Sequence, residues 1–230
     1  MNPLNSKFEF LTMRDLREMQ WEILRPPTNT RPAIRRVSNG ELRAVVKDFS
    51  TLSPVYRNTA GRFLVWREAK AYRRLRGIRG IPEFYRVIEG LALVIQEIPG
   101  VNIENLGKDA ALGESFFRDL ESLLTEVHEK GVAHCDLKRA ANTLVGEDGR
   151  PYIIDWAAAI LDSEFKWYPL NLVFRRFLLD DLFAVIKIKL RHIPEKVDPA
   201  EMARYNRRSQ GEKLIRSVRD RLRALLQKIV

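Results

Sequence analysis

Cysteine is nearly absent from this sequence: Cys135 is the only one among 230 residues, so no internal disulfide can form. That suits a reducing compartment, and we expect a cytoplasmic protein in which Cys135 is a small packing residue. Residues 1–9 lack the charged segment and apolar run that mark a signal peptide. Apolar runs are also short, as at residues 91–95, and none is long enough to span a bilayer.

Two further shortages concern particular stretches of the chain. Gly40 is the only glycine between Met1 and Thr59, so the first part of the chain lacks a glycine-rich loop that could wrap a phosphate. No serine or threonine occurs in residues 164–208, which leaves little there for a switch based on Ser/Thr phosphorylation to act on.

What is present is typical of a globular protein. Hydrophobic residues make up 45% of the chain and charged residues 30%. A length of 230 residues suffices for one two-lobed domain or for two separate ones. The formal net charge of +10 favours an anionic partner, which could be nucleic acid, a phosphorylated lipid or a membrane surface.

A polar cluster followed by two apolar strands carries the clearest chemistry. Residues 132–145 combine His, Asp, Lys and Asn side chains with an apolar end, and a turn at residues 146–149 leads to a second strand that ends on Asp155. Such a hairpin predicts that Asn142, at its start, lies close to Asp155. Their oxygens suit Mg²⁺, which takes one or two carboxylates together with substrate phosphates. Upstream, the short spacing of Asp136 and Lys138 suits a base beside a phosphate-neutralising cation, which is the logic of phosphoryl transfer.

These residues resemble the motifs of the protein-kinase-like superfamily. The segment His134-Cys135-Asp136-Leu137-Lys138 is similar to the catalytic-loop pattern H-x-D-L-K, and Asp155-Trp156-Ala157 is similar to a degenerate D-F-G. Asn142 resembles the metal-binding Asn of the family, but it follows Asp136 by six residues instead of five. We therefore expect a one-residue bulge that leaves Asn142 in place. His134 is interpreted as a hydrogen-bonding prop for the loop.

The resemblance implies an α+β, two-lobed protein-kinase-like fold. It would form a single domain, with a small antiparallel sheet in the N-lobe (residues 1–98) and a compact, mostly helical C-lobe (residues 99–230). Lys47 shares a strand face with Val45 and Phe49, and by similarity to V-A-I-K it would hold the α/β-phosphates of ATP. Glu68 falls in the inward stripe of a helix over residues 61–76 and is its expected ion-pair partner. The alternatives are an exposed strand-edge lysine and a solvated glutamate.

Other N-lobe elements follow from local patterns. Thr12 is a candidate N-cap of a helix that would run through Leu24. Residues 25–32 are too rich in proline to continue it. Residues 33–49 predict the first hairpin, which in kinase-like folds covers the nucleotide phosphates. Without glycines, that cover would come from ordinary backbone or from Arg35 and Arg36.

The remaining elements complete the expected fold. Residues 84–97 predict a strand pair, after which the Gln96 carbonyl and the Ile98 amide would face adenine by the resemblance. We read the arginines of the helix at 61–76 as a solvated face, with an acidic ligand as the alternative partner. Further helices are predicted at residues 111–130 and 177–192. In the latter, Asp181 would brace the catalytic-loop backbone by the same resemblance.

Residues 201–230 predict a basic amphipathic helix or pair, which would pack on the C-lobe or lie on an acidic membrane. His128 and His192 lack metal-ligand companions and are interpreted as structural.

Within the superfamily, residues 61–69, 77–82 and 181–187 are most similar to the lipopolysaccharide core (Kdo/heptose) kinases, which are related to RIO-type kinases. The resemblance implies an ATP- and Mg²⁺-dependent phosphotransferase. Its acceptor would be a sugar hydroxyl of an acidic glycolipid, the bacterial lipopolysaccharide core, met at the inner face of the inner membrane. The alternatives are a RIO-like protein kinase, whose basic surface meets a ribosomal or nucleic-acid-bound partner, and a pseudokinase that only binds.

Overall fold

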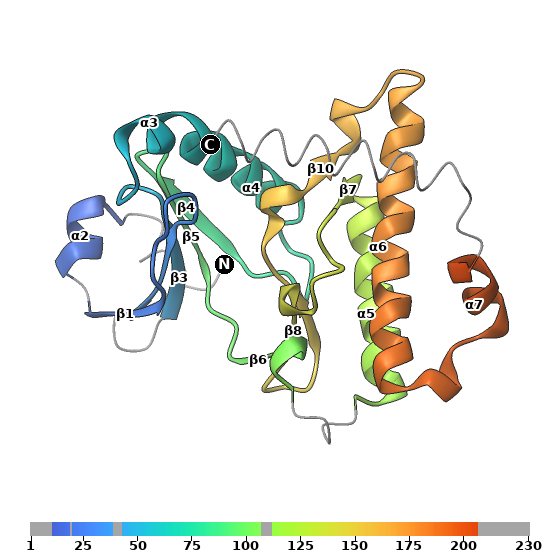
Figure 1. Cartoon of the computed structure of the whole chain (residues 1–230). Coiled ribbons are helices and arrows are strands. Elements are labelled where there is room, and N and C mark those ends of the chain that lie inside the picture. The colour runs from blue at the N-terminus through green and yellow to red at the C-terminus, as the bar shows by residue number, and fades with distance from the viewer. Residues whose placement is uncertain (1–10, 19, 39–42, 107–111, 207–230) are drawn as a thin grey trace.

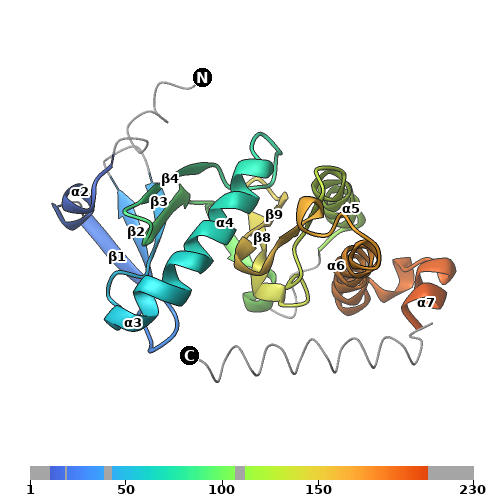
Figure 2. The same cartoon turned by 90° about the horizontal axis from the view of Figure 1, so that it is seen from above.

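The computed structural model describes residues 11–18, 20–38, 43–106 and 112–206. Figures 1 and 2 show an antiparallel sheet beside a mostly helical part, with helix α4 (Arg62–Arg74) lying along the sheet and reaching the helical part. We call the described residues of 11–98 the sheet lobe and those of 99–206 the helical lobe. The α+β architecture predicted from the sequence is confirmed.

The sheet has five strands in the order β1-β2-β3-β5-β4, and all neighbours are antiparallel. Both hairpins predicted over residues 33–49 and 84–97 are present. Glu89 and Gly90 join the second pair with φ angles of 52° and 70°, as a tight turn matched to the strand twist requires. The strands are β1 (Gln20–Arg25), β2 (Ala33–Ser38), β3 (Arg43–Asp48), β4 (Phe84–Ile88) and β5 (Ala92–Gln96).

The first helix is shorter than predicted. Thr12 caps α2 (Met13–Glu18) reciprocally, because its amide donates to the Asp15 carboxylate at 2.7 Å and its hydroxyl accepts from the Asp15 amide at 3.2 Å. The chain then enters β1 instead of continuing as a helix to Leu24. Trp21 and Ile23 favour extended backbone, and pairing with β2 satisfies their backbone groups.

Helix α4 is part of the sheet lobe and also packs against the helical lobe. The largest cluster of buried apolar side chains runs from α4 and β5 into helices α5 (Glu114–Glu129) and α6 (Leu170–His192). Arg67 donates to the Ala159 carbonyl at 2.5 Å, and Arg74 donates to the Lys130 carbonyl at 2.8 Å. The prediction of a solvated arginine face was therefore wrong for Arg67, whose side chain is only 19% exposed. Arg74 is exposed as predicted. Both arginines fasten α4 to the helical lobe.

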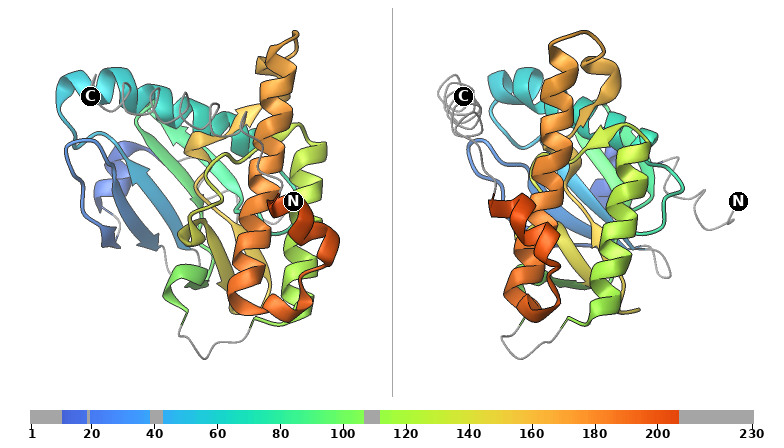
Figure 3. Two further views of the ribbon diagram at one scale, coloured as in Figure 1. Left: turned by 45° about the vertical axis from the view of Figure 1, so that its right-hand side comes forward. Right: turned by 90° about the vertical axis from the view of Figure 1, so that its right-hand side faces the viewer.

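The helical lobe is built on α5 and α6, which pack side by side (Figure 3). Helix α5 ends where predicted, because Gly131 has a φ of 71° and a Cβ there would meet the Asp162 carboxylate. Helix α6 starts at Leu170, earlier than the predicted residue 177. The sequence did not predict the first turns because their apolar residues, among them Leu172, Val173 and Leu179, are exposed and form no one-sided pattern.

Short elements complete the structure. They are α3 (Pro54–Tyr56), β6 (Gly100–Asn102), β7 (Val132–Ala133), the hairpin β8 (Thr143–Gly146) and β9 (Pro151–Ile153), β10 (Ile160–Leu161) and α7 (Pro199–Asn206). Most of the predicted basic tail, residues 207–230, lies outside the described residues. None of the described helices combines the length and the apolar composition needed to cross a membrane.

Candidate active site

Lys47 joins the two lobes through a pair of carboxylates. It points from β3 towards α4, and its Nζ donates to Glu68 Oε1 and to Asp155 Oδ1, both at 2.6 Å. The Lys47 and Glu68 side chains are only 10% and 3% exposed. The ion pair predicted from the strand and helix patterns is therefore present, and its second carboxylate comes from the end of the β8–β9 hairpin.

The charges of this cluster support one another. Burial alone would lower the pKa of Lys47, but the Asp155 and Glu68 carboxylates outweigh it and raise that pKa. Lys47 in turn lowers the pKa of Asp155 to about 2, against the effect of burial. Burial raises the pKa of Glu68 although Lys47 opposes this. At neutral pH the cluster thus presents a fixed ammonium beside an ionised Asp155.

Asp155 is held in an uncommon backbone conformation. Its φ is 66°, in the left-handed region, and Cys135 in the facing loop has a φ of 65°. Each such residue costs about 1–3 kcal/mol and persists only where its surroundings impose it. Here Trp156 follows directly, is fully buried, and donates from its indole nitrogen to the Ile153 carbonyl at 3.3 Å. The tryptophan after Asp155 therefore anchors the carboxylate.

The loop before Asp136 is braced from helix α6. The His134 and Cys135 amides donate to the two Asp181 carboxylate oxygens at 2.7 and 3.0 Å, so the brace assigned to Asp181 has the expected geometry. His134 Nδ1 accepts from the Asp136 amide at 3.2 Å, and its Nε2 lies 2.9 Å from the Ile154 carbonyl. A neutral imidazole with its proton on Nε2 satisfies both contacts, which fits the role of a prop. The sequence did not reveal that His128 also contacts Asp181, at 3.3 Å.

Asn142 keeps its contact with Asp136 despite the longer spacing. The intervening residues end in a 3₁₀ turn, Ala140–Asn142. The Asn142 side-chain nitrogen donates to the Asp136 carbonyl at 3.0 Å, and its backbone carbonyl accepts from the Ile154 amide at 3.0 Å. The two ends of the hairpin are therefore neighbours, and the Asn142 side-chain oxygen is left as an acceptor near Asp155.

A cavity of about 390 Å³ connects several of these residues. Lys138, Asn142 and Asp155 all line it, and Asp136 lies next to them through its contacts with Asn142 and with Arg139, whose Nη1 is 3.4 Å from Asp136 Oδ2. The other charged lining residues are Arg25, Glu104, Arg139, Lys187 and Arg191.

Gln96 and Ile98 are not among the residues that line this cavity. They lie where the chain leaves β5 for the helical lobe. The Gln96 amide donates to the Glu83 carbonyl at 2.8 Å, and its side-chain oxygen accepts from the Glu83 amide at 3.1 Å. Gln96 thus ends β5 and Ile98 lies in the connection to β6, and the structure does not bring either residue together with the charged cluster.

The hairpin connection that lies beside Lys47 joins β1 to β2, and it is not the turn of the predicted hairpin at residues 33–49. Strand register places Arg25 of β1 opposite Ile34, and Ile34 opposite Lys47, so the connection at residues 26–32 lies at the Lys47 end of the sheet. Arg25 lines the cavity, where burial lowers its pKa and Asp155 partly offsets this. Arg25 comes close to Asp155 only because β1 pairs with β2 and β2 pairs with β3. Local sequence patterns did not indicate this pairing.

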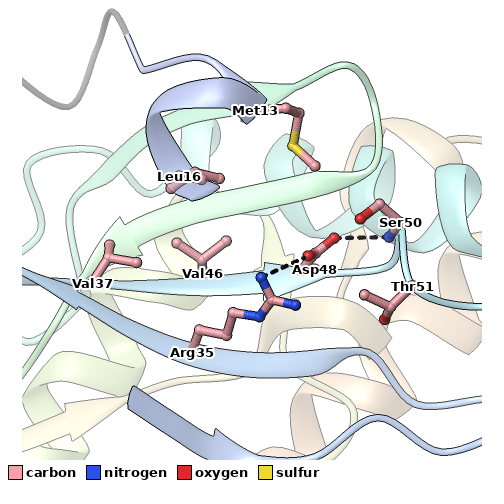
Figure 4. Close-up of a pocket in the computed structure, with 8 residues that line it drawn as sticks. All are labelled: Met13, Leu16, Arg35, Val37, Val46, Asp48, Ser50 and Thr51. Carbon is pink, nitrogen blue, oxygen red and sulfur yellow. Dashed lines mark hydrogen bonds and ion pairs between the residues drawn. The ribbon is translucent and has the colours of Figure 1, made fainter. Parts of the chain in front are cut away.

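The arginines suggested for phosphate cover are engaged elsewhere. Arg35 lies on the face of the sheet opposite Lys47, in a second cavity beneath α2, with its Nη1 at 3.5 Å from the Asp48 carboxylate (Figure 4). Arg36 pairs with Glu97 at 2.6 Å and with Glu22 at 2.7 Å. The interpretation that these two side chains cover the site was wrong.

The donors around Asp155 suit a hard cation bound together with phosphate. Among the described residues there is no group of three or more His, Cys, Asp or Glu side chains that could hold a metal unaided. One carboxylate from Asp155 and one amide oxygen from Asn142 line the same cavity. Mg²⁺ commonly uses such a small set of protein oxygens and takes the rest of its ligands from phosphate and water.

Comparison with known proteins supports the fold. No protein-family model and no curated protein sequence matches the chain. Two solved structures of the Rio2 kinase from Chaetomium thermophilum, one described as an ADP/Mg²⁺-phosphoaspartate complex, are similar with TM-scores of 0.57 and 14% identity. Each match covers 84% of this chain but only 62% and 64% of the Rio2 chains. The chain has a protein-kinase-like fold, and these kinase neighbours are of the RIO type.

Proposed function

We propose that this chain is an ATP- and Mg²⁺-dependent phosphotransferase, formed by a single two-lobed domain. The observation that carries the proposal is the bridge from Lys47 to Glu68 and Asp155, set beside Asp136 and Asn142. One of the two carboxylates that Lys47 holds, Asp155, also lines a cavity together with Lys138 and Asn142. That arrangement suits a site in which phosphate oxygens share the lysine.

Each residue has a role in this proposal. Lys47, oriented by Glu68, binds the α/β-phosphates, while Asn142 and Asp155 would hold Mg²⁺, which when bound neutralises phosphate charge. Asp136 orients the acceptor hydroxyl and takes its proton as the oxygen bonds to the γ-phosphorus. The bond from that phosphorus to the β–γ bridging oxygen breaks, and ADP leaves. Lys138 stabilises the negative charge on the transferred group.

For adenine, we propose the Gln96 carbonyl and the Ile98 amide at the junction of the lobes. Backbone groups of this kind can pair with the adenine edge, and the junction adjoins β3, which carries Lys47. Replacing either side chain would leave such contacts intact, so nucleotide affinity should change little in Gln96→Ala.

The acceptor has two candidates. Residues 61–69, 77–82 and 181–187 resemble lipopolysaccharide core kinases, which favours a sugar hydroxyl of an acidic glycolipid met at the inner face of a bacterial inner membrane. The similarity to Rio2 kinase structures favours a protein acceptor equally well. A binding module that transfers nothing is the third reading, and the presence of Lys47, Asp136 and Asp155 argues against it.

Incubation with γ-labelled ATP and Mg²⁺ tests the proposal. Label should appear in lipopolysaccharide core glycolipid or, for a RIO-like enzyme, in protein. Asp136→Asn should reduce transfer by about 10²–10⁴-fold, since it removes the proton acceptor. Asp119→Asn is the matched control, because that exposed carboxylate lies on α5 outside the cavity lining. ATP hydrolysis that survives unchanged in both Asp136→Asn and Asp155→Asn would defeat the assigned roles.

A further inference from the structure

Strand β1 contains a bulge that decides which of its side chains faces Lys47. The pairing of β1 with β2 skips Leu24, so that Arg25 lies opposite Ile34. Ile34 in turn lies opposite Lys47 on β3. Residues directly opposite each other in antiparallel strands point to the same face of the sheet, so Arg25 shares the face of Lys47. In a regular strand Leu24 would occupy that position. Bulges of this kind re-aim side chains and are common beside active sites.

The bulge brings Arg25 to the charged cluster. Arg25 lines the cavity that Lys138 and Asp155 also line. Burial lowers the pKa of Arg25, and the nearby Asp155 carboxylate opposes that effect. Among the described residues Arg25 makes no hydrogen bond or ion pair, and Asp155 is already bound by Lys47. The guanidinium donors of Arg25 are therefore available to a ligand in the cavity.

The β1–β2 connection at residues 26–32 has few backbone amides to offer a phosphate. It contains no glycine, and three of its seven residues are prolines, which lack an amide hydrogen. The Thr28 amide donates to the Arg31 carbonyl at 3.0 Å, and the Arg31 amide donates to the Thr28 hydroxyl at 3.2 Å. Of the connection's amides, these bonds leave those of Asn29 and Thr30, whereas a glycine-rich loop offers a run of amides to a phosphate. Cover for a phosphate at this end of the sheet therefore has to come from a side chain.

Arg25 and Lys47 flank the place expected for the phosphates. Strand β2 lies between their strands, and a spacing of about 4.8 Å between neighbouring strands puts their backbones about 10 Å apart. Lys47 reaches Asp155 from the sheet, whereas Arg25 shares the cavity with Lys138, which is assigned above to the transferred group. The lysine is therefore suited to the inner phosphates and the arginine to the terminal one.

A second guanidinium converges on the same place. Arg139 lines the cavity, and its like charge adds to the lowering of the Arg25 pKa by burial. Arg139 has a partner in Asp136, whose Oδ2 is 3.4 Å from its Nη1. Bringing Arg25 beside it from the other lobe adds a repulsion that a bound anion would offset. The two like charges thus cost stability in the absence of a ligand and suit a site that holds several phosphate charges.

We propose that Arg25 binds the γ-phosphate of ATP in place of the backbone amides that a glycine-rich loop would supply. Its planar fork can donate two parallel hydrogen bonds to phosphate oxygens, whereas a lysine ammonium acts as a point charge. Although the role of Arg25 rests on the proposed phosphotransferase activity, the residue itself lies outside the kinase-like motifs. Arg25 is then the side chain that lets the site distinguish ATP from ADP.

Nucleotide binding by the full chain tests this role. The probes are ADP and a non-hydrolysable ATP analogue, each with Mg²⁺, and calorimetry measures their affinities. The wild type should bind the ATP analogue more tightly than ADP. Arg25→Gln should weaken binding of the analogue about tenfold, because charge-assisted hydrogen bonds are lost, and should leave ADP binding nearly unchanged. Equal weakening of both ligands, or of neither, would overturn the assignment of Arg25 to the γ-phosphate.

A variant in which two neighbours are exchanged, Leu24→Arg/Arg25→Leu, tests the bulge. It keeps the composition and the net charge, and the core should not be disturbed because Leu24 is 42% exposed. The exchanged variant should lose affinity for the ATP analogue as Arg25→Gln does. If it binds the analogue as the wild type does, the position set by the bulge is not needed and the role of Arg25 is overturned.

Arg43→Gln is the control for charge, because Arg43 is an exposed arginine at the other end of the sheet, opposite Ser38, and does not line the cavity. It should bind both nucleotides as the wild type does. A loss of affinity equal to that of Arg25→Gln would mean general charge attraction and overturn the role of Arg25. Urea unfolding of all variants checks that each is folded under the conditions of the binding measurement.

Failure of the two proposals can be told apart. If phosphoryl transfer depends on Asp136 while Arg25→Gln binds the ATP analogue as the wild type does, the phosphotransferase stands and the role of Arg25 is overturned. If ATP hydrolysis is unaffected by Asp136→Asn and Asp155→Asn but the protein still prefers the analogue over ADP through Arg25, the catalytic proposal fails and the γ-phosphate site stands. A wild type that binds neither nucleotide overturns both.

Discussion

Lys47 and Asp48 are adjacent on β3, and the two faces of the sheet use them differently. Both are buried, at 8% and 3% exposure, and each is in an ion pair. Lys47 faces α4 and connects three elements from both lobes through Glu68 and Asp155. Asp48 faces the opposite side, where it pairs with Arg35 of the next strand and accepts from the Ser50 amide at 2.8 Å.

The comparison shows that a buried charge is not by itself a sign of function. The Asp48 pair stabilises its own sheet face beneath α2 and is closed within one lobe (Figure 4). One polar atom of this pair is left unsatisfied, because Arg35 Nε is buried and has no hydrogen-bond partner among the described residues. Both ion pairs adjoin a cavity, but the one beneath α2 is lined by residues of the sheet lobe alone. The Lys47 cluster differs because Asp155 comes from the helical lobe and shares its cavity with Lys138 and Asn142. Function is inferred from the residues that share this second site.

The largest effect is expected for Lys47→Met. The substitution leaves Glu68 buried without its cation, which should lower the free energy of unfolding by about 3–5 kcal/mol. Nucleotide turnover should also be lost, because the phosphates lose their lysine. Urea unfolding and ATP turnover measure the two effects. If stability falls while turnover of the folded variant persists, Lys47 is as structural as Asp48 and the distinction between the faces disappears.

Asp48→Asn should have a smaller and one-sided effect. It leaves the Arg35 guanidinium with weaker compensation in a buried place, which should cost about 1–3 kcal/mol of stability. Turnover of the folded protein should be unchanged, since no contact of Asp48 reaches the cavity around Asp155. The same unfolding and turnover assays apply, and lost turnover in a stable Asp48→Asn protein would mean that the two faces are coupled through β3.

The acid sensitivity of the Lys47 cluster sharpens the comparison further. Asp155 has a pKa lowered from 3.8 to about 2 in the folded protein, so its contribution to stability is fully present above pH 4 and is lost as the pH falls towards 2. In Asp155→Asn, the free energy of unfolding should fall less between pH 4 and pH 2, because the contribution of the Asp155 carboxylate is absent. Urea unfolding at several pH values between 4 and 2 provides the measurement. An identical decline in Asp155→Asn and wild type would contradict the charge state assigned to Asp155.

Glu22→Ala should give the smallest effect on stability. Glu22 pairs with Arg36 at the surface, and its side chain is 64% exposed. Such pairs contribute about 0–1 kcal/mol. Thermal unfolding should therefore shift only slightly. Arg36→Ala should leave nucleotide affinity unchanged, because Arg36 is engaged by Glu97 and Glu22. A large loss of affinity would restore the sequence-based interpretation that Arg36 covers phosphates.

Motif spacing predicted the parts of the site that are local in sequence. Asp136, Asn142 and Asp155 lie on one loop and one hairpin, and Glu68 follows from helical periodicity. Arg25 could not be found this way, because its position depends on pairing of β1 with β2 and of β2 with β3. The same limit explains β1 itself: Leu16, Met19 and Ile23 have helical spacing, yet only strand pairing decides where the helix stops.

Helix α4 sets how the molecule can admit a ligand. It carries Glu68, which pairs with Lys47 of the sheet, and Arg67 and Arg74 bind it to the helical lobe. A motion that separated the lobes would therefore expose the apolar cluster that they share. Ligand entry by a wide hinge motion is therefore costly. The connection between β1 and β2, exposed over residues 26–31, lies at the Lys47 end of the sheet and is the less costly segment to displace. Lys47, Glu68 and Asp155 are already in contact with one another before any ligand binds.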